Sequence, residues 1–177
     1  AYLGEDALTK GVRMKISSWT RLDHNTMPPA AKTVGNYVNS SLAKVEALKA
    51  GYDEAIMLNP QGFVSECTGE NIFVVRNGVI LTPPLSAGAL EGITQNCVAQ
   101  IAAELGYEMR VENIVRSDLY IAEEIFCCGT AAEVSAINSV DDREVPCPGP
   151  ITTAVAGLYA KAVRGQVAHY KHWCELA

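Results

Sequence analysis

The sequence lacks the features that mark membrane, secreted and nucleic-acid-binding proteins. Its apolar runs are far shorter than the roughly 18 to 20 residues of a membrane span, and it shows no basic-then-apolar signal pattern at its N-terminus. No cluster of lysine and arginine is present to neutralise nucleic-acid phosphates, and the net charge is -6. We therefore expect a cytoplasmic protein with neither a membrane nor a nucleic-acid partner.

Patterns of metal ligands are also missing. The six cysteines include no C-x-x-C pair, and the three histidines lie apart from them in the sequence. We expect no metal site, and we expect the cysteines, including adjacent Cys127 and Cys128, to be reduced and mostly buried. The 177 residues are instead 49% hydrophobic and 19% charged, which predicts one folded domain or most of a two-domain protein.

Hydrophobic residues recur at helical spacing in several segments. In the first, Val38, Leu42 and Val45 lie on one face, and Gly51 is placed to end the helix. The second ends before Gly106, and the third is short, with Ser117 as a candidate N-cap. Helices are predicted over 35–50, 93–105, 117–122 and 150–164.

Short apolar and β-branched runs predict strands between these helices. Asn77-Gly78 lies between two such runs and predicts a hairpin, and a second hairpin is expected around Asp141-Asp142. Strands are predicted over 12–17, 54–58, 63–65, 72–75, 79–81, 108–114 and 124–128. Hairpins next to helices predict an α/β fold whose sheet is mixed or antiparallel and flanked by helices, in contrast to a doubly wound parallel fold.

Four short segments concentrate chemically useful residues. A single lysine after a Pro-Pro loop is usually a surface residue, so the argument depends on the ordered set and its spacing. The segments are Ala31-Lys32-x-x-Gly35-Asn36-Tyr37, Ser65-Glu66-x-x-Gly69-Glu70-Asn71, Leu90-x-Gly92-Ile93-Thr94 and Gly129-Thr130-Ala131-Ala132-Glu133. In this order they resemble the class IV pyridoxal-phosphate aminotransferases, and within them the bacterial branched-chain group.

The resemblance covers nearly the whole chain and implies pyridoxal-phosphate fold type IV, the D-amino acid aminotransferase-like fold. It implies that Lys32 is the catalytic lysine that bonds to pyridoxal 5'-phosphate, and that Tyr37 lies near the phenolic oxygen of this cofactor. It places Glu66 at the pyridine nitrogen. An amine can form an imine with an aldehyde and then act as a base, and a carboxylate favours the protonated pyridine. Without the motif, Tyr37 would be an ordinary core residue and Glu66 a solvated one.

The resemblance also assigns cofactor-binding roles to Leu90, Ile93, Thr94 and Thr130. Ile93 and Thr94 begin a predicted helix, whose first N–H groups favour an anion such as the cofactor phosphate. Thr130 is implied near the same phosphate, and Thr130 with Ala131 is implied to bind the substrate carboxylate. The alternative for Thr94 is an ordinary helix cap.

Two departures from the family pattern qualify the resemblance. Gln95 stands where the pattern has a lysine or arginine. Family members also carry a small N-terminal domain, with a phosphate-binding arginine and aromatic pocket residues, that the sequence does not include. We therefore expect residues 1–177 to be the C-terminal, cofactor-binding large domain, with one wall of the pocket missing.

The sequence thus favours a branched-chain aminotransferase that exchanges leucine, isoleucine or valine with 2-oxoglutarate. The alternatives are 4-amino-4-deoxychorismate lyase or D-amino acid aminotransferase of the same fold. A further alternative is a non-catalytic fragment that only folds or dimerises. The resemblance also implies a homodimer or larger homo-oligomer, because family members place their active sites near a subunit interface.

Overall fold

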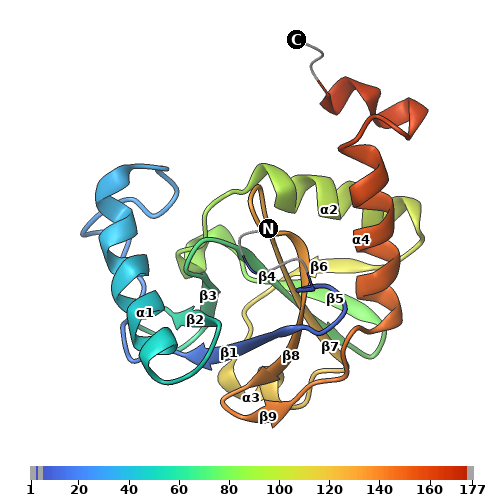
Figure 1. Ribbon diagram of the computed structural model, residues 1–177. Helices are drawn as coiled ribbons and strands as arrows, with labels where there is room; N and C mark the ends of the chain where they lie inside the picture. Colours follow the sequence, from blue (N-terminus) through green and yellow to red (C-terminus); the bar gives the residue numbers. More distant parts are fainter. Residues whose placement is uncertain (1–2, 4–5, 175–177) are drawn as a thin grey trace.

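The computed structural model describes residue 3 and residues 6–174. In this part of the chain, four α-helices and nine strands form one α/β unit, together with three short 3-10 segments (Figure 1). The α-helices are α1 (Tyr37–Lys49), α2 (Ile93–Glu104), α3 (Arg116–Tyr120) and α4 (Pro150–Ala162). The 3-10 segments are η1 (Val34–Asn36), η2 (Leu85–Ala87) and η3 (Ala168–Trp173). No helix in the described part of the chain has the length and apolar character needed to cross a membrane.

The nine strands form one mixed sheet, as predicted. They are β1 (Val12–Ile16), β2 (Glu54–Leu58), β3 (Val64–Cys67), β4 (Asn71–Arg76), β5 (Val79–Thr82), β6 (Met109–Val111), β7 (Glu124–Gly129), β8 (Glu133–Val140) and β9 (Arg143–Glu144). The order is β3-β2-β1-β8-β7-β4-β5-β6, with β9 paired to β8. β1 runs parallel to β2 and β8, and β5 runs parallel to β6, whereas the other pairs are antiparallel.

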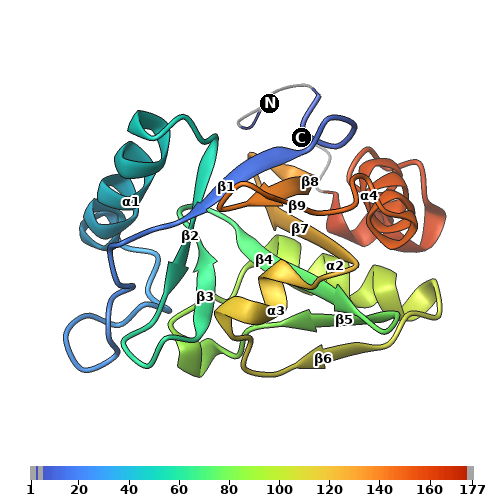
Figure 2. The same cartoon turned by 90° about the horizontal axis from the view of Figure 1, so that it is seen from below.

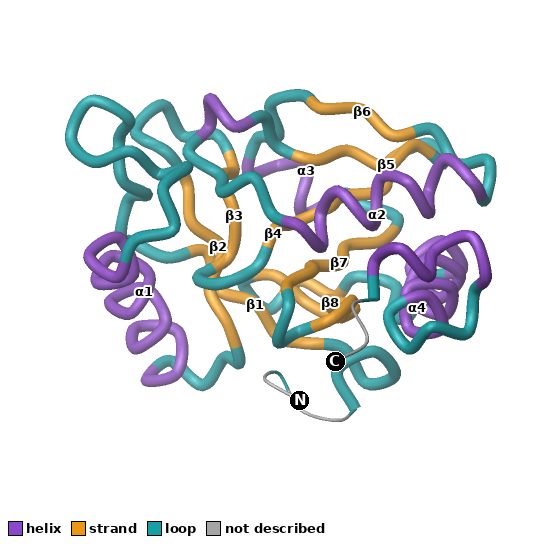
Figure 3. Tube along the Cα trace, turned by 90° about the horizontal axis from the view of Figure 1, so that it is seen from above, coloured by secondary structure: helices purple, strands orange, loops and turns teal. Residues whose placement is uncertain are grey.

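The central strands are buried on both faces because their side chains alternate between two cores. On β4, Ile72 and Val74 belong to one core, whereas Phe73 and Val75 belong to the other. Phe73 stacks on Phe126 of β7 with ring centroids 4.7 Å apart. Helices α2 and α4 cover this second core side by side, while α1 lies at the other end of the sheet, beside β1 and β2 (Figures 2 and 3).

Helix α4 begins on a carboxylate supplied by a distant strand. Glu124, at the start of β7, accepts hydrogen bonds from the backbone N–H groups of Ile151 and Thr152 at 3.0 and 2.8 Å. The hydroxyl of Thr152 donates a third at 2.6 Å. A Cβ added at Gly149 would lie 1.9 Å from the carboxyl carbon of Glu124, so this contact requires glycine.

Three details differ from the sequence-based expectations. Ser117 lies inside α3 and does not cap it; the Asp118 carboxylate instead accepts the N–H of Val115 at 3.0 Å. The hairpin at Asp141-Asp142 is present as predicted, but the predicted strand ranges did not include its first arm, the eight-residue strand β8. In α1 the buried residues are the small Ser40, Ala43 and Ala47. The apolar residues with helical spacing lie instead on its exposed face: Val38, Leu42, Val45 and Leu48.

Candidate active site

The loop before η1 presents Lys32 beside a small cavity. Buried Asn36 fixes this loop, because its side-chain amide donates to the carbonyls of Pro28 and Ala31, both at 2.9 Å. Ala31 directly precedes Lys32, and Lys32 is exposed and lines the cavity. The side-chain oxygen of Asn36 is buried without a hydrogen-bond partner among the described residues, and Asn36 lines the same cavity.

Glu66 lies on β3 and is 6% exposed. Its Oε1 is 2.6 Å from Nη2 of Arg21, and its Oε2 accepts the N–H of Leu90 at 2.8 Å. Burial raises the pKa of Glu66, and the Arg21 guanidinium, the Leu90 N–H and the Lys32 ammonium oppose that rise. Leu90 thus contributes a backbone donor to this carboxylate, a role that the sequence motif did not indicate.

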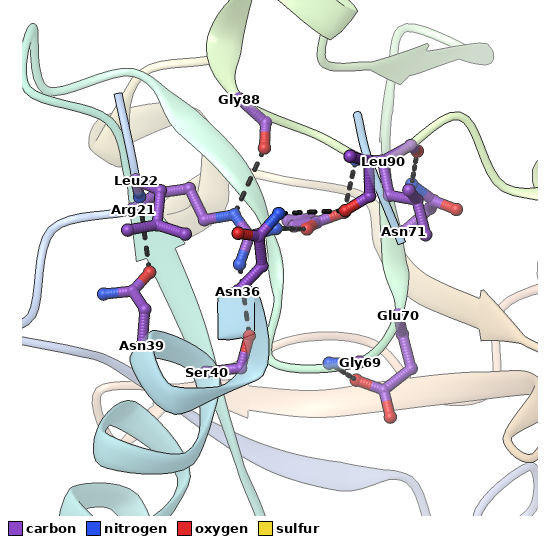
Figure 4. Close-up of polar contacts among 12 residues, drawn as sticks. Arg21, Leu22, Asn36, Asn39, Ser40, Gly69, Glu70, Asn71, Gly88 and Leu90 are labelled. Carbon is purple, nitrogen blue, oxygen red and sulfur yellow. Dashed lines mark hydrogen bonds and ion pairs between the residues drawn. The ribbon is translucent and has the colours of Figure 1, made fainter. Parts of the chain in front are cut away.

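Arg21 is a site residue that the sequence analysis missed. It is 6% exposed, and besides Glu66 it donates from Nε to the carbonyl of Gly88 at 3.2 Å and from Nη1 to the hydroxyl of Ser40 at 3.1 Å (Figure 4). The backbone N–H of Arg21 donates to Leu58 at the end of β2. Because β2 pairs with β3, with Met57 opposite Glu66, this bond brings Arg21 alongside Glu66.

Two adjacent cavities bring together several of the predicted site residues. The first, of about 30 Å³, is lined by Lys32, Tyr37, Glu66 and Leu90, together with Arg21. The second, of about 410 Å³, also borders Tyr37 and continues to Ala131 and Ala132 in the turn between β7 and β8. Residues that line both are Tyr37, Ser40, Thr68, Gly69 and Glu70.

The predicted phosphate-binding residues lie outside the linings of these two cavities. Ile93 and Thr94 begin α2, after Gly92; Ile93 is exposed and borders a separate cavity, and Thr94 is buried. Thr130 is exposed in the turn that follows β7. Gln95 donates to the hydroxyl of Thr82 on β5 at 3.2 Å, so in this chain it pairs with the sheet.

The start of α2 is held close to Glu66 of β3 without a side-chain cap of its own. Among the described residues, no side-chain cap hydrogen bond and no acidic residue lie in its first turn. Asn71 of β4 donates to the carbonyl of Leu90 at 2.8 Å, and its side-chain oxygen would lie 2.1 Å from a Cβ at Gly92. Glycine therefore allows Asn71 to tie this helix start to Leu90, the same residue that binds Glu66.

Residues 2–140 match the sequence profile of the amino-transferase class IV family. The match covers well over half of the chain, and the lysine loop, the Glu66 strand and the start of α2 all fall inside it. The chain belongs to the class IV aminotransferase family.

Similar proteins within this family include branched-chain enzymes by name. The chain is 49% identical over 168 residues to a probable branched-chain-amino-acid aminotransferase of Aquifex aeolicus, covering 93% of this chain and 54% of that protein. It is 43% identical over 175 residues to the branched-chain-amino-acid aminotransferase of Pseudomonas aeruginosa, with 98% and 57% covered. The chain therefore spans a little over half the length of the curated relatives that it matches.

Solved structures of branched-chain aminotransferases have the same fold. The Thermoproteus uzoniensis enzyme with norvaline superposes with a TM-score of 0.93 at 47% identity, covering 96% of this chain and 57% of that one. The Thermobaculum terrenum enzyme in its PLP-bound holo form gives a TM-score of 0.92 at 40% identity, with 98% and 56% covered. The expected fold type IV is thus confirmed by neighbours at 40 and 47% identity.

Proposed function

We propose that this chain is the cofactor-binding large domain of a branched-chain aminotransferase, and that the whole protein interconverts leucine, isoleucine or valine with their 2-oxo acids. The second substrate pair would be glutamate and 2-oxoglutarate. The observation that carries the proposal is the exposed amine of Lys32 on the same small cavity as the arginine-paired carboxylate of Glu66. The names of the relatives, at 42 to 49% identity, support the branched-chain substrates.

The residues present fit pyridoxal 5'-phosphate by the chemistry of their groups. Lys32 offers an amine, Tyr37 a hydroxyl, and Glu66 a carboxylate for the ring nitrogen, and all three line one cavity. The uncapped start of α2, with Ile93 and Thr94, offers N–H groups to the phosphate, and Thr130 adds a hydroxyl. When bound, this cofactor supplies an aldehyde that reacts with amines and a ring that delocalises negative charge.

Each residue then has a defined task in the proposed reaction. The Lys32 amine would hold the cofactor and would then act as the base that moves the proton at the substrate α-carbon. Glu66 keeps the ring nitrogen protonated, and Arg21 and the Leu90 N–H hold that carboxylate in place. The backbone around Thr130 and Ala131 orients the substrate through its carboxylate.

We also propose a cytoplasmic homo-oligomer. The exposed apolar face of α1 supports association, because Val34, Val38 and Leu42 line a cavity of about 430 Å³ on the outside of the chain. A second copy or the small domain of the family would cover this face. The relatives are nearly twice as long as this chain, so the 177 residues on their own should show little turnover.

The lysine assignment is tested by trapping. Purified protein with pyridoxal phosphate should show the visible absorption band of lysine-bound cofactor, and borohydride reduction with peptide mass mapping should place the adduct on Lys32. Lys32→Ala should lose the band, whereas Lys49→Ala, which removes an exposed lysine of α1, should keep it. An adduct on any other lysine would refute the assignment.

The substrate assignment is tested on the protein completed with a small domain. It should transaminate leucine with 2-oxoglutarate, whereas the present chain should not. Release of pyruvate and 4-aminobenzoate from aminodeoxychorismate would change the assignment to the lyase. A strict preference for D-amino acids would change it to D-amino acid aminotransferase. A completed protein that traps no cofactor would support the non-catalytic alternative.

A further inference from the structure

A second buried carboxyl, which the proposed reaction leaves without a role, lies four residues after Glu66. Glu70 is 3% exposed and lines both cavities of the candidate site. Within the described residues, the hydrogen bond shown for this carboxyl comes from the N–H of Gly69, at 3.2 Å (Figure 4). Such a long single bond compensates little of the cost of burying a charged carboxylate.

Lys44, the cation whose charge acts on Glu70, is already bound to another carboxylate. Glu54 of β2 is fully buried and accepts hydrogen bonds from Lys44 at 2.7 Å, from the Thr68 hydroxyl at 2.6 Å and from the Ala55 N–H at 2.6 Å. Lys44 also donates to the carbonyl of Asp53 at 2.8 Å. Two buried carboxyls therefore share the field of one ammonium group, and the geometry favours Glu54 as its partner.

Burial, and then the charge of Glu54, raise the pKa of Glu70 to about 7, while the Gly69 N–H and Lys44 oppose the rise and Glu66 adds to it. The thiols of Cys67 and Cys127 also lie near this carboxyl. The hydrogen bond with Cys127 and then burial raise the pKa of Cys67, whereas the same bond lowers and burial raises that of Cys127, which is raised on balance. The titratable groups that face Glu70 are thus Lys44 from α1, Glu54 from β2, Glu66 and Cys67 from β3, and Cys127 and Cys128 from β7.

Glu70 also packs beneath the turn that is proposed to bind the substrate carboxylate. A Cβ added at Gly129 would lie 3.6 Å from Cγ of Glu70 and 3.2 Å from the carbonyl oxygen of Gly69. The larger cavity joins Glu70 to Ala131 and Ala132 of the same turn. A negative charge on Glu70 would therefore repel any anion that binds to the turn.

We propose that Glu70 is a positioning residue of the substrate-carboxylate site and serves it by holding a proton. A neutral Glu70 lets the turn of Gly129 to Ala132 bind an anionic carboxylate, whereas an ionised Glu70 repels that anion. This inference rests on the proposed function, because that function places the substrate carboxylate at Thr130 and Ala131. It predicts that carboxylate binding weakens as the pH rises through the titration of Glu70.

The test uses the full 177-residue chain loaded with pyridoxal phosphate, with 4-methylvalerate as the probe, because this compound is ionised at both pH values and is unreactive at the cofactor. Binding is followed by NMR through the backbone amides of Ala131 and Ala132. The dissociation constant should rise roughly tenfold between about pH 6 and about pH 8.5, the size expected for a like charge nearby. In Glu70→Gln it should stay at the low-pH value throughout.

Controls separate this proposal from simpler outcomes. Glu112→Gln, which removes an exposed glutamate after β6, should keep the wild-type pH dependence. If Glu70→Gln does not fold, Glu70→Met and the ¹³C carboxyl titration of the wild type take its place. An equal pH dependence with and without Glu70, or no effect on the amides of the turn at either pH, would overturn the proposal. The borohydride adduct on Lys32 would still support the proposed function in both cases.

Discussion

Glu66 and Glu70 are two carboxyls on one short stretch of chain, equally hidden from solvent and very differently partnered. Glu66 has an arginine on one oxygen and a backbone N–H on the other. Among the described residues, Glu70 has a single long hydrogen bond, and Glu54 adds a repulsive charge. Burial raises the pKa of both, so we expect the partners, not the depth of burial, to determine which carboxyl is charged and which keeps a proton.

The largest effect should come from removing the partner of Glu66. Arg21→Gln leaves a buried carboxylate without its counter-charge, which costs about 3 to 5 kcal/mol of unfolding free energy for a broken buried pair. Urea denaturation at neutral pH measures the loss. Arg21→Gln combined with Glu66→Gln should recover part of it, because no uncompensated charge then remains.

The matched control is Arg110→Gln, which breaks the exposed ion pair between Arg110 and Glu108. Surface ion pairs contribute about 0 to 1 kcal/mol to stability, so the unfolding free energy of this variant should be close to that of the wild type. If Arg21→Gln behaved like Arg110→Gln, the view that Glu66 depends on Arg21 would be wrong.

A pH-dependent effect of intermediate size should come from Glu70. Because its pKa is about 7 in the folded protein and near 4.5 when unfolded, the folded state binds the proton more tightly. The stabilisation is complete below pH 4.5 and is lost as the pH rises to 7, by about 3 kcal/mol in total. Unfolding free energies of Glu70→Gln, measured from about pH 4.5 to about pH 8, should lack this decline. A parallel decline in both proteins would assign it to other groups.

The smallest effect should come from the hydroxyl that supports Arg21. Ser40→Ala removes the acceptor of the Nη1 hydrogen bond but leaves the ion pair with Glu66 in place. We expect a loss of about 1 kcal/mol in thermal or urea unfolding. Ser41→Ala, on the exposed side of the same helix, should change little. Equal changes at both positions would show that the hydrogen bond to Arg21 contributes nothing.

The elements and the lysine motif were accessible from the sequence because their signals are local. Periodicity predicted the helices, and Asn77-Gly78 predicted its hairpin, where the structure has positive φ at both residues. Spacing and resemblance identified Lys32, Tyr37, Glu66 and Leu90, which line one cavity.

What escaped the sequence depends on contacts between distant segments. Arg21 contacts Glu66, 45 positions away in the sequence, because two long-range pairings bring them together. The backbone N–H of Arg21 donates to Leu58 of β2, and β2 pairs with β3, which carries Glu66. In α1 the spacing of Val38 and Leu42 identified an apolar face, but it did not specify which face the sheet covers. Small residues, Ala43 and Ala47, allow the close approach to the sheet instead.

The carboxylate that begins α4 has a consequence for how this chain can vary. The side chain of Glu124 fills the space that a side chain at position 149 would need. A substitution at 149 should therefore be tolerated only where residue 124 has become short. A short residue 124 would in turn leave the N–H groups of Ile151 and Thr152 without their acceptor. The residues at positions 124, 149 and 152 should therefore change together across relatives, although position 152 lies 28 residues after position 124.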